Sequence, residues 1–358
     1  MLNDTHGADI YSAAEKSGIN KYEIIDFSSN INPLGIPERV KKSAIDSIEN
    51  AIKYPDINSR ELIKSISIAE NVPEGWIFAS NGAADAIYRI SFYIKPKRGI
   101  VTSPAFSEYE NSLTAAGSII QYYNLIEEND YKIQDDFIDY INSETELVFL
   151  CNPNNPTGQI TNKGIIEKII ARCNELGTFV VIDECFLDFV ENKDEYSAVN
   201  LLEKYNNLII LKAFTKIYAI PGIRLGYCMS SNKNVIEGLK VIGPPWNVST
   251  IAQAAGIAAL KEKAYMDETV GYIKMQREYL VQELNKLDIK IYESYANYLL
   301  FKIYDEINLK EELVKKGILI RSCSNYRGLG RNFYRIAVKS AEENKLLINA
   351  IKELKGKK

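Results

Sequence analysis

Histidine is almost absent from this chain. The 358 residues include a single histidine, His6. A metal centre built on imidazoles and a Ser-His-Asp triad are both disfavoured by this count, because each depends on histidine side chains. We therefore expect no metal site, and we expect any catalysis to depend on a bound organic cofactor.

Cysteine is scarce as well. The five cysteines are odd in number, no two of them have Cys-x-x-Cys spacing, and most have apolar neighbours. They are Cys151, Cys173, Cys185, Cys228 and Cys323. This pattern predicts free buried thiols in a reducing compartment rather than disulfides or a metal site.

Long apolar runs and a strong charge of one sign are also missing. Lys and Arg total 43 and Asp and Glu total 47, and both signs are mixed along the chain. Such a balance does not favour a nucleic-acid partner. No apolar run approaches the roughly 20 residues that span a bilayer, and the first residues lack the basic and apolar regions of a secretion signal. We expect a cytoplasmic protein without a membrane partner.

Short apolar segments alternate with helical patterns from about residue 76 onward. Expected strands lie near Ile77–Ala79, Gly99–Thr102, Leu147–Cys151, Phe179–Asp183, Leu208–Leu211 and Leu225–Met229. Expected helices between them include Ala83–Ile94, Glu108–Ala116 and Gly164–Leu176. Fully apolar strands separated by helices predict an α/β fold with a mostly parallel sheet covered on both faces. Functional residues of such a sheet lie beyond the carboxyl ends of its strands.

The chain divides into three expected parts. Residues 1–36 form a polar arm, and residues 37–245 form a large domain with the alternating pattern, beginning with a helix from Pro37 to Lys53. A helical region, Ser249–Leu287, follows and suggests at least two helices that bridge the domains. Further strands are expected near Ile289–Tyr292, Tyr298–Lys302, Ile318–Arg321 and Phe333–Ala337. We expect residues 246–358 to hold the bridge and a smaller α+β domain, against which the arm packs.

Lys216 is the most informative side chain of the large domain. It follows the apolar run Leu208–Leu211 and precedes Arg224 by eight residues. A lysine between buried strands is costly unless it acts as a neutral nucleophile or is bonded to a carbonyl carbon, and a nearby arginine can hold a phosphate. An amine with a phosphate clamp suits pyridoxal phosphate (PLP). From this segment alone, an ordinary surface lysine is an equal alternative.

Two polar segments follow other apolar strands. Asp183 ends the strand Phe179–Asp183, where a buried carboxylate needs a cationic partner such as a protonated pyridine nitrogen. A helix cap or a metal carboxylate is the alternative. The turn Asn152–Gly158 follows a further strand, and Asn155 can present its amide there, although a bare turn has the same sequence.

Other candidate residues carry less information individually. Asn81 and Gly82 precede a helix whose first N–H groups can bind an anion, and a simple tight turn is the alternative. Phe106 can stack on an aromatic cofactor or belong to the core. Arg321 and Arg335 lie in expected strands of the small domain, which suggests a substrate with two anionic groups. Solvated edge positions are the alternative, and for Arg321 this alternative is equal.

Four of these motifs, in this order, resemble the fold-type I PLP enzymes of the aminotransferase class I/II superfamily. They are Asn81-Gly82 before a helix, Asn152-Pro-Asn-Asn-Pro-Thr-Gly158, Asp183-Glu184 after a strand, and Thr215-Lys216 with Arg224. The resemblance covers nearly the whole chain. It implies an aspartate-aminotransferase-like fold with PLP as the cofactor.

The resemblance also implies roles around the cofactor ring. Lys216 would be bonded to the aldehyde of PLP, and Asp183 would pair with its ring nitrogen. Asn155 would bind the ring hydroxyl, and Phe106 would stack on the ring. Phe186 departs from the superfamily pattern, since many relatives have a tyrosine there that donates to the ring oxygen.

A second group of residues would hold the cofactor phosphate. By the same resemblance these are Asn81, Gly82, Thr215, Arg224 and, from the partner subunit of a homodimer, Tyr54. Ala213 departs from the pattern, because many relatives have a phosphate-binding Ser or Thr at this position.

Within the superfamily, five further segments resemble the threonine-phosphate decarboxylases of cobalamin biosynthesis. They are His6-Gly7, Asp26–Gly35, Pro104–Tyr109, Ile320–Tyr326 and Phe333–Val338. This likeness implies decarboxylation of O-phospho-L-threonine to (R)-1-amino-2-propanol O-2-phosphate. It implies that His6, Asn32 and Arg321 bind the substrate phosphate, and that Arg335 binds the α-carboxylate.

Three other functions fit the same motifs. Histidinol-phosphate aminotransferases share the core motifs, but they usually have Asn-Glu-Asn-Pro where this chain has Asn30-Ile-Asn-Pro33. A decarboxylase of O-phosphoserine would act on a substrate smaller by one methyl group, which discriminates by only about 1–3 kcal/mol. A non-catalytic regulator or binding protein with the PLP fold is the third, although no nucleic-acid-binding segment accompanies the core.

Overall fold

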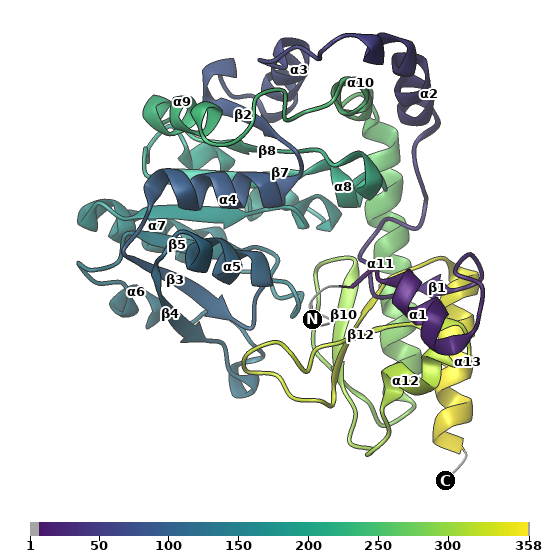
Figure 1. Ribbon diagram of the computed structural model, residues 1–358. Coiled ribbons are helices and arrows are strands. Elements are labelled where there is room, and N and C mark those ends of the chain that lie inside the picture. The colour runs from purple at the N-terminus through teal and green to yellow at the C-terminus, as the bar shows by residue number, and fades with distance from the viewer. Residues whose placement is uncertain (1–6, 357–358) are drawn as a thin grey trace.

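Within residues 7–356, which the computed structural model describes, a seven-stranded sheet forms the core of the larger domain (Figure 1). The strand order is β2-β8-β7-β6-β5-β3-β4. β8 is antiparallel to both of its neighbours, and the other neighbouring pairs are parallel. The strands are β2 (Ile77–Ser80), β3 (Arg98–Ser103), β4 (Ile119–Asn124), β5 (Leu147–Cys151), β6 (Phe179–Asp183), β7 (Leu208–Ala213) and β8 (Gly226–Met229). The expected α/β fold with a mostly parallel sheet is confirmed.

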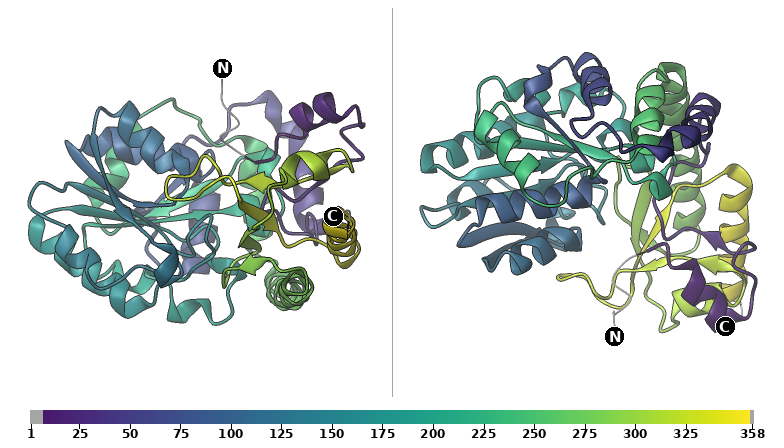
Figure 2. Two further views of the ribbon diagram at one scale, coloured as in Figure 1. Left: turned by 90° about the horizontal axis from the view of Figure 1, so that it is seen from below. Right: turned by 45° about the horizontal axis from the view of Figure 1, so that its top comes forward.

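Helices cover both faces of this sheet (Figure 2). Alternate residues of each strand point to opposite faces, so Phe149 and Val181 belong to one hydrophobic cluster while Val148 and Val180 belong to another. The helices of the first face are α4 (Ala83–Ile94), α5 (Ser107–Ala115) and α9 (Lys233–Val241), and those of the second include α3 (Arg60–Glu70) and α7 (Lys163–Leu176). Burial on both faces explains why the central strands are apolar throughout.

β4 is not among the strands expected from the sequence. This strand lies at one edge of the sheet beside β3, and most of its residues are exposed or half-buried. Its polar residue Gln121 interrupts the apolar run that marks the central strands. An edge strand needs no continuous apolar run, because it is not covered on all sides.

The smaller domain contains two sheets. Antiparallel strands lie in the order β12-β13-β10-β9, and β1 of the N-terminal arm pairs in parallel with β11. The strands are β1 (Ile25–Asp26), β9 (Lys290–Ile291), β10 (Tyr298–Lys302), β11 (Ile318–Leu319), β12 (Arg321–Ser322) and β13 (Phe333–Ala337). The helices are α1 (Ile10–Ser17), which the sequence analysis did not predict, α12 (Leu309–Val314) and α13 (Ala341–Gly356). Figure 1 shows α1 against this domain, and residues of α1 and α12 line one hollow together.

A long helix joins the two domains. α11 (Lys263–Asn285) follows α10 (Thr250–Ala259) and runs from the large domain along the small one (Figure 1). The continuous helix expected from Pro37 to Lys53 is instead α2 (Glu38–Asp46) followed by a 3-10 turn (Ser47–Ile52). The Ser47 hydroxyl donates to the carbonyl of Ala44 at this junction, which competes with the regular helix bonds. Within residues 7–356, no helix is both long and apolar enough to cross a membrane.

Candidate active site

A cavity of about 400 Å³ lies at the carboxyl ends of β5, β6 and β7. Its walls come from the large domain, the small domain and the arm. The lining includes Ala83, Ala84, Phe106, Tyr109, Asn155, Asp183, Thr215, Lys216, Arg224 and Arg335, together with Gly7, Ser28 and Asn30 of the arm. Most of the residues that the sequence analysis singled out therefore meet at one place.

Lys216 lies in α8 (Phe214–Ile217), the short helix that follows β7. Its side chain lines the cavity. Burial, and then the positive charges of Arg335 and Arg224, lower the pKa of Lys216 to about 8. A substantial fraction of this amine is neutral near pH 8, and the neutral amine is the form that attacks a carbonyl carbon. The site therefore favours a nucleophilic lysine.

Asp183 is the last residue of β6 and is 5% exposed. Its Oδ2 accepts a hydrogen bond of 2.6 Å from the Tyr109 hydroxyl, and its Oδ1 accepts one of 2.9 Å from the Cys185 backbone N–H. Burial raises the pKa of Asp183, and these hydrogen bonds oppose the rise. A buried carboxylate of this kind is stabilised by a cationic ligand atom in the cavity.

The N-terminus of α4 reaches the same cavity through Ala83 and Ala84. Gly82 precedes this helix with φ +83°, and no side-chain cap forms there among the described residues. A β-carbon at Gly82 would lie 2.6 Å from Nη2 of Arg224, so the guanidinium packs against this glycine. Helix N–H groups beside an arginine form an anion site.

Thr215 and Asn81 take different positions around this anion site. Thr215 is buried and lines the cavity. Asn81 is exposed, and its backbone N–H donates to Oδ2 of Asp85 at 3.0 Å. Asn81 therefore adjoins the helix N-terminus without lining the cavity.

Arg335 connects β13 of the small domain to the turn after β5. Its Nη1 donates to Oδ1 of Asn155 at 2.5 Å, and its Nη2 donates to the carbonyl of Ser28 at 2.7 Å. Its Nε is buried and has no hydrogen-bond partner among the described residues. A buried donor without an acceptor costs about 1–3 kcal/mol, so an anionic group that reached this nitrogen would be bound favourably.

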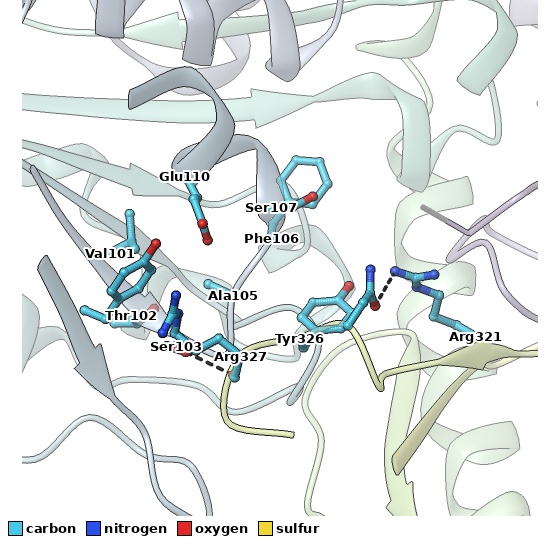
Figure 3. Close-up of a pocket in the computed structure, with 12 residues that line it drawn as sticks. Val101, Thr102, Ser103, Ala105, Phe106, Ser107, Glu110, Arg321, Tyr326 and Arg327 are labelled. Atoms are coloured by element: carbon cyan, nitrogen blue, oxygen red, sulfur yellow. Dashed lines mark hydrogen bonds between the residues drawn. The ribbon is translucent and has the colours of Figure 1, made fainter. Parts of the chain in front are cut away.

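Arg321 lies opposite Arg335 in the β12–β13 pair, and both side chains are buried. Nη2 of Arg321 donates to Oδ1 of Asn325 at 2.9 Å, and the guanidinium carbon lies 5.5 Å from the centre of the Tyr326 ring. Arg321 lines a smaller cavity of about 60 Å³, which shares Phe106 and Tyr326 with the larger one (Figure 3). The two arginines are thus cross-strand neighbours, but only Arg335 lines the larger cavity.

The loop that carries Tyr326 also contacts the large domain (Figure 3). The Ser103 hydroxyl donates to the carbonyl of Arg327 at 3.0 Å. The guanidinium carbon of Arg327 lies 3.9 Å from the centre of the Tyr122 ring. These contacts close one side of the space between the domains.

The structure does not bring Asn32 to the cavity. Its amide donates to the carbonyl of Ile217 at 2.8 Å and to the Thr269 hydroxyl at 2.9 Å, so it supports helix α8. Asn30, which the sequence analysis did not select, lines the cavity, and its Oδ1 is buried with no partner among the described residues. His6 lies outside the described residues.

Tyr54 does not line the cavity of its own chain. It is 79% exposed, and its ring stacks on Trp246 with the centroids 4.5 Å apart. The assignment of Tyr54 to the site of a second subunit therefore stays a prediction.

The two positions that depart from the family pattern both lie at the cavity. Ala213 and Phe186 line it, and so does Phe106, the expected stacking residue. Tyr109 was missed by the sequence analysis. It follows Phe106 by about one helical turn, and this spacing is the signal that could have placed both side chains on one face.

These side chains fit PLP. The cavity combines an amine of lowered pKa, a buried carboxylate suited to a ring nitrogen, and a helix N-terminus with an arginine suited to a phosphate. In contrast, residues 7–356 contain no group of three or more His, Cys, Asp or Glu side chains that could hold a metal ion.

Residues 22–351 match the family described as aminotransferase class I and II. The chain belongs to this family. Members of this aminotransferase family use PLP, and PLP is the cofactor of this chain. The fold is of the aspartate-aminotransferase type.

Individual relatives divide between two activities. The chain is 33% identical to a threonine-phosphate decarboxylase of Salmonella typhimurium over 356 residues, which cover 99% of this chain and 97% of the relative. It is 32% identical to the solved histidinol-phosphate aminotransferase of Clostridium acetobutylicum, with a TM-score of 0.87 and coverage of 93% and 99%. A histidinol-phosphate aminotransferase of Sinorhizobium meliloti, solved with pyridoxal-5'-phosphate, shares the fold at 20% identity, with a TM-score of 0.87 and coverage of 98% and 95%.

Proposed function

We propose that this member of the aminotransferase family is a carboxy-lyase that converts O-phospho-L-threonine to (R)-1-amino-2-propanol O-2-phosphate, a step in cobalamin side-chain synthesis. The observation that carries the proposal is the pair of buried arginines, Arg321 and Arg335, on neighbouring strands of the small domain. Two adjacent guanidinium groups suit a small substrate with a phosphate and a carboxylate. The likeness to the Salmonella typhimurium decarboxylase supports this substrate.

Bound PLP supplies an electron-withdrawing ring for a bond that breaks at the substrate Cα. Lys216 would be the residue that carries the cofactor covalently, and Asp183 would keep the ring nitrogen protonated. Thr215, Gly82 and Arg224 would bind the cofactor phosphate at the N-terminus of α4. Each of these residues lines the cavity or packs against a residue that does.

The arginine pair would decide which bond breaks. Arg335 would hold the carboxylate, through the side of the guanidinium that carries Nε, and Arg321 would hold the phosphate together with His6. Two fixed points restrict rotation of the substrate about its amino group. The bond from Cα to the carboxylate then breaks, CO₂ leaves, and Cα gains a proton.

Histidinol-phosphate aminotransfer is the second candidate, and the similarity to the Clostridium acetobutylicum enzyme favours it. Histidinol phosphate has a phosphate but no carboxylate, so Arg335 would serve only the carboxylate of the second substrate, the amino acceptor 2-oxoglutarate. The decarboxylase uses both arginines for one molecule. The two proposed activities can therefore be distinguished by which substrate the enzyme converts.

The proposal includes a homodimer in the cytoplasm, in which Tyr54 of one subunit binds the cofactor phosphate of the other. The exposed Tyr54 ring, which does not line its own cavity, supports this arrangement. Neither a nucleic acid nor a membrane is a proposed partner.

The test is an incubation of the PLP-loaded enzyme with each of three substrates. O-phospho-L-threonine, O-phospho-L-serine and histidinol phosphate with 2-oxoglutarate are supplied separately, and CO₂ and amine products are followed. We expect CO₂ from O-phospho-L-threonine at the highest kcat/KM. Transfer from histidinol phosphate without CO₂ release would establish the second candidate, and no turnover of any of the three would point to a binding protein.

Arg321→Gln provides the matched test of the arginine pair. We expect it to raise KM for O-phospho-L-threonine about tenfold or more, because a charge-assisted phosphate contact is lost. Arg331→Gln is the control, since Arg331 is an exposed arginine of the same domain. Equal effects of the two substitutions would contradict the assignment of Arg321.

A further inference from the structure

Tyr54 and Trp246 form an exposed aromatic pair that is attached to the N-terminus of α4 through Asp85. We propose that Trp246 is a positioning residue, which holds Tyr54 ready for the cofactor phosphate in a second copy of the chain. We further propose that Asp85 couples this pair to the cofactor site of its own subunit. The inference rests on the proposed homodimer and on the proposed role of Tyr54.

First, the carboxylate of Asp85 contacts two segments, the N-terminus of α4 and the segment that carries Trp246. Oδ2 of Asp85 accepts hydrogen bonds from the backbone N–H of Asn81 at 3.0 Å and from Nδ2 of Asn247 at 3.1 Å. Asn81 directly precedes Gly82 at the N-terminus of α4, and Asn247 directly follows Trp246. A displacement of either segment therefore changes the hydrogen bonding of the other.

The second observation is a buried arginine that fixes the segment before Trp246. Arg89 is 3% exposed, and its Nε donates to Oδ1 of Asp85 at 2.9 Å. Its two Nη atoms donate to backbone carbonyls in and just after the last turn of α9, namely those of Leu239, Ile242 and Pro244. A β-carbon at Gly243 would lie 2.8 Å from the guanidinium carbon, so the backbone closes tightly around the charge. A buried guanidinium bound in this way makes the segment rigid.

The third observation concerns Trp246 itself. Its backbone has φ +55°, in the left-handed region, which is unusual for a large aromatic residue. The ring does not enter the core of its own domain, since it is 42% exposed and stacks on Tyr54 at an interplanar angle of 29°. Strained backbone that presents an exposed aromatic residue is typical of a functional position.

Stacking restricts the Tyr54 ring to one orientation before a second subunit arrives. An exposed tyrosine without such a contact would lose its rotamer freedom on binding, and that loss weakens the contact. Because Tyr54 is already stacked on Trp246, it loses less rotamer freedom when it binds. The Tyr54 hydroxyl should then bind a phosphate in the other copy of the chain more tightly than an unrestrained tyrosine would.

The test measures the dissociation constant for PLP with the full-length dimer. We expect Trp246→Ala to raise this constant about tenfold, because a charge-assisted hydrogen bond from Tyr54 is weakened. Trp246→Phe keeps a ring for stacking and should restore most of the affinity. Tyr22→Ala is the control, because Tyr22 is also an exposed aromatic residue but belongs to the arm. Sedimentation at the same protein concentrations ensures that dissociation of the dimer is not mistaken for loss of PLP.

Hybrid dimers distinguish positioning in the partner from a local structural effect. In the first hybrid, one subunit carries Trp246→Ala and the other carries Lys216→Ala. The remaining Lys216 then receives Tyr54 from a subunit with Trp246, so it should retain PLP, measured by borohydride trapping, better than in the second hybrid described next. Any loss relative to wild type acts through Asp85 of the same subunit. In the second hybrid, one subunit is wild type and the other carries both substitutions. Its remaining Lys216 should lose PLP about tenfold more easily.

The outcomes separate the inference from the proposal on which it rests. If Tyr54→Phe leaves the PLP dissociation constant unchanged, or if the protein is a monomer, the proposed role of Tyr54 is wrong. If Tyr54→Phe weakens PLP binding but Trp246→Ala does not, the positioning role of Trp246 is wrong. Loss of PLP from the first hybrid but not from the second would show a local effect and would also overturn the inference.

The coupling through Asp85 is tested separately, by the PLP dissociation constant of an Asp85→Asn variant. Asp85→Asn keeps the size of the side chain but removes its charge and replaces one of its two acceptor oxygens with a donor. It therefore cannot accept from Arg89 and from the Asn81–Asn247 pair at the same time. We expect a PLP dissociation constant raised about tenfold, and a smaller additional effect of Trp246→Ala in this background than in wild type. Full additivity of the two substitutions would contradict the coupling.

Discussion

The Tyr109 hydroxyl donates a hydrogen bond of 2.6 Å to Oδ2 of Asp183, and this contact joins α5 to the end of β6. The hydrogen bond stabilises the ionised carboxylate against the effect of burial. The proposed electron-withdrawing state of PLP requires that same ionised carboxylate. Tyr109 would therefore act on the cofactor through Asp183.

Tyr109→Phe tests this relationship. The loss of the hydrogen bond raises the pKa of Asp183 further, so the carboxylate becomes protonated at a higher pH. We expect kcat/KM to fall about tenfold, and we expect the acidic limb of its pH profile to move to higher pH. The ring should stay in place, because Tyr109 stacks on Phe149 at 5.2 Å. An unchanged acidic limb would contradict the role of Tyr109.

Lys216 should make the stability of the cofactor-free protein depend on pH. Its pKa is lowered from 10.5 to about 8 in the folded protein. Between these values the unfolded chain binds more protons than the folded chain, so stability rises with pH across this window. Below pH 8 the full destabilisation, up to roughly 3 kcal/mol, is present.

Lys216→Met removes this destabilisation. We expect the cofactor-free variant to be more stable than the cofactor-free wild type at pH 7, and we expect the difference to shrink as the pH approaches 10. Urea unfolding of both proteins at several pH values measures it. Lys64→Met is the control, because Lys64 is exposed. A difference that does not change with pH would mean that packing, and not the charge of Lys216, is responsible.

Gly82→Ala should weaken PLP binding as well as stability. The residue has φ +83°, and an added β-carbon would lie 2.6 Å from Nη2 of Arg224. We expect a loss of about 1–3 kcal/mol in the free energy of unfolding from the backbone strain, and a weaker PLP complex because Arg224 must move. Gly177→Ala is a matched control. It has φ +71°, and no atom lies within 4 Å of an added β-carbon, so it should reduce stability without changing PLP affinity.

The two neighbouring asparagines should respond differently to substitution. Asn30→Ala removes a buried oxygen that lines the cavity, and we expect a higher KM for O-phospho-L-threonine with little loss of stability. Asn32→Ala removes donors to Ile217 and Thr269, and we expect unfolding to become easier by about 1–3 kcal/mol. Steady-state kinetics and urea unfolding of both variants check this pair. The reverse pattern would restore Asn32 as the substrate residue.

Sequence reasoning succeeded where a functional residue follows a buried strand. Asp183 ends one apolar strand and Lys216 follows another within a few residues, and both strands are correctly placed. The carboxyl ends of parallel strands meet at one edge, so the order of the motifs along the chain already predicts that they meet in space. The bounds of β5 and β6 agree with those expected because the apolar run is continuous in each strand, and the bounds of α4 agree as well.

Sequence reasoning failed where side-chain direction depends on tertiary contacts. Asn30 and Asn32 lie in an irregular segment, in which no period of 2 or 3.6 residues indicates which of them faces the cavity. The Tyr109–Asp183 hydrogen bond and the Arg89 contacts link residues far apart in the chain. Such contacts leave no local pattern, and the three-dimensional fold is needed to find them.

The pairing of β1 with β11 determines when the small domain can form during synthesis. Ile25 and Asp26 leave the ribosome early, but their partners Ile318 and Leu319 are made near the end of the chain. The strands of the large domain are all made before that point, and they pair only among themselves. β1 therefore has no partner strand while the large domain can already fold, and the space between the domains can be completed only after β11 and the strands that follow it are made.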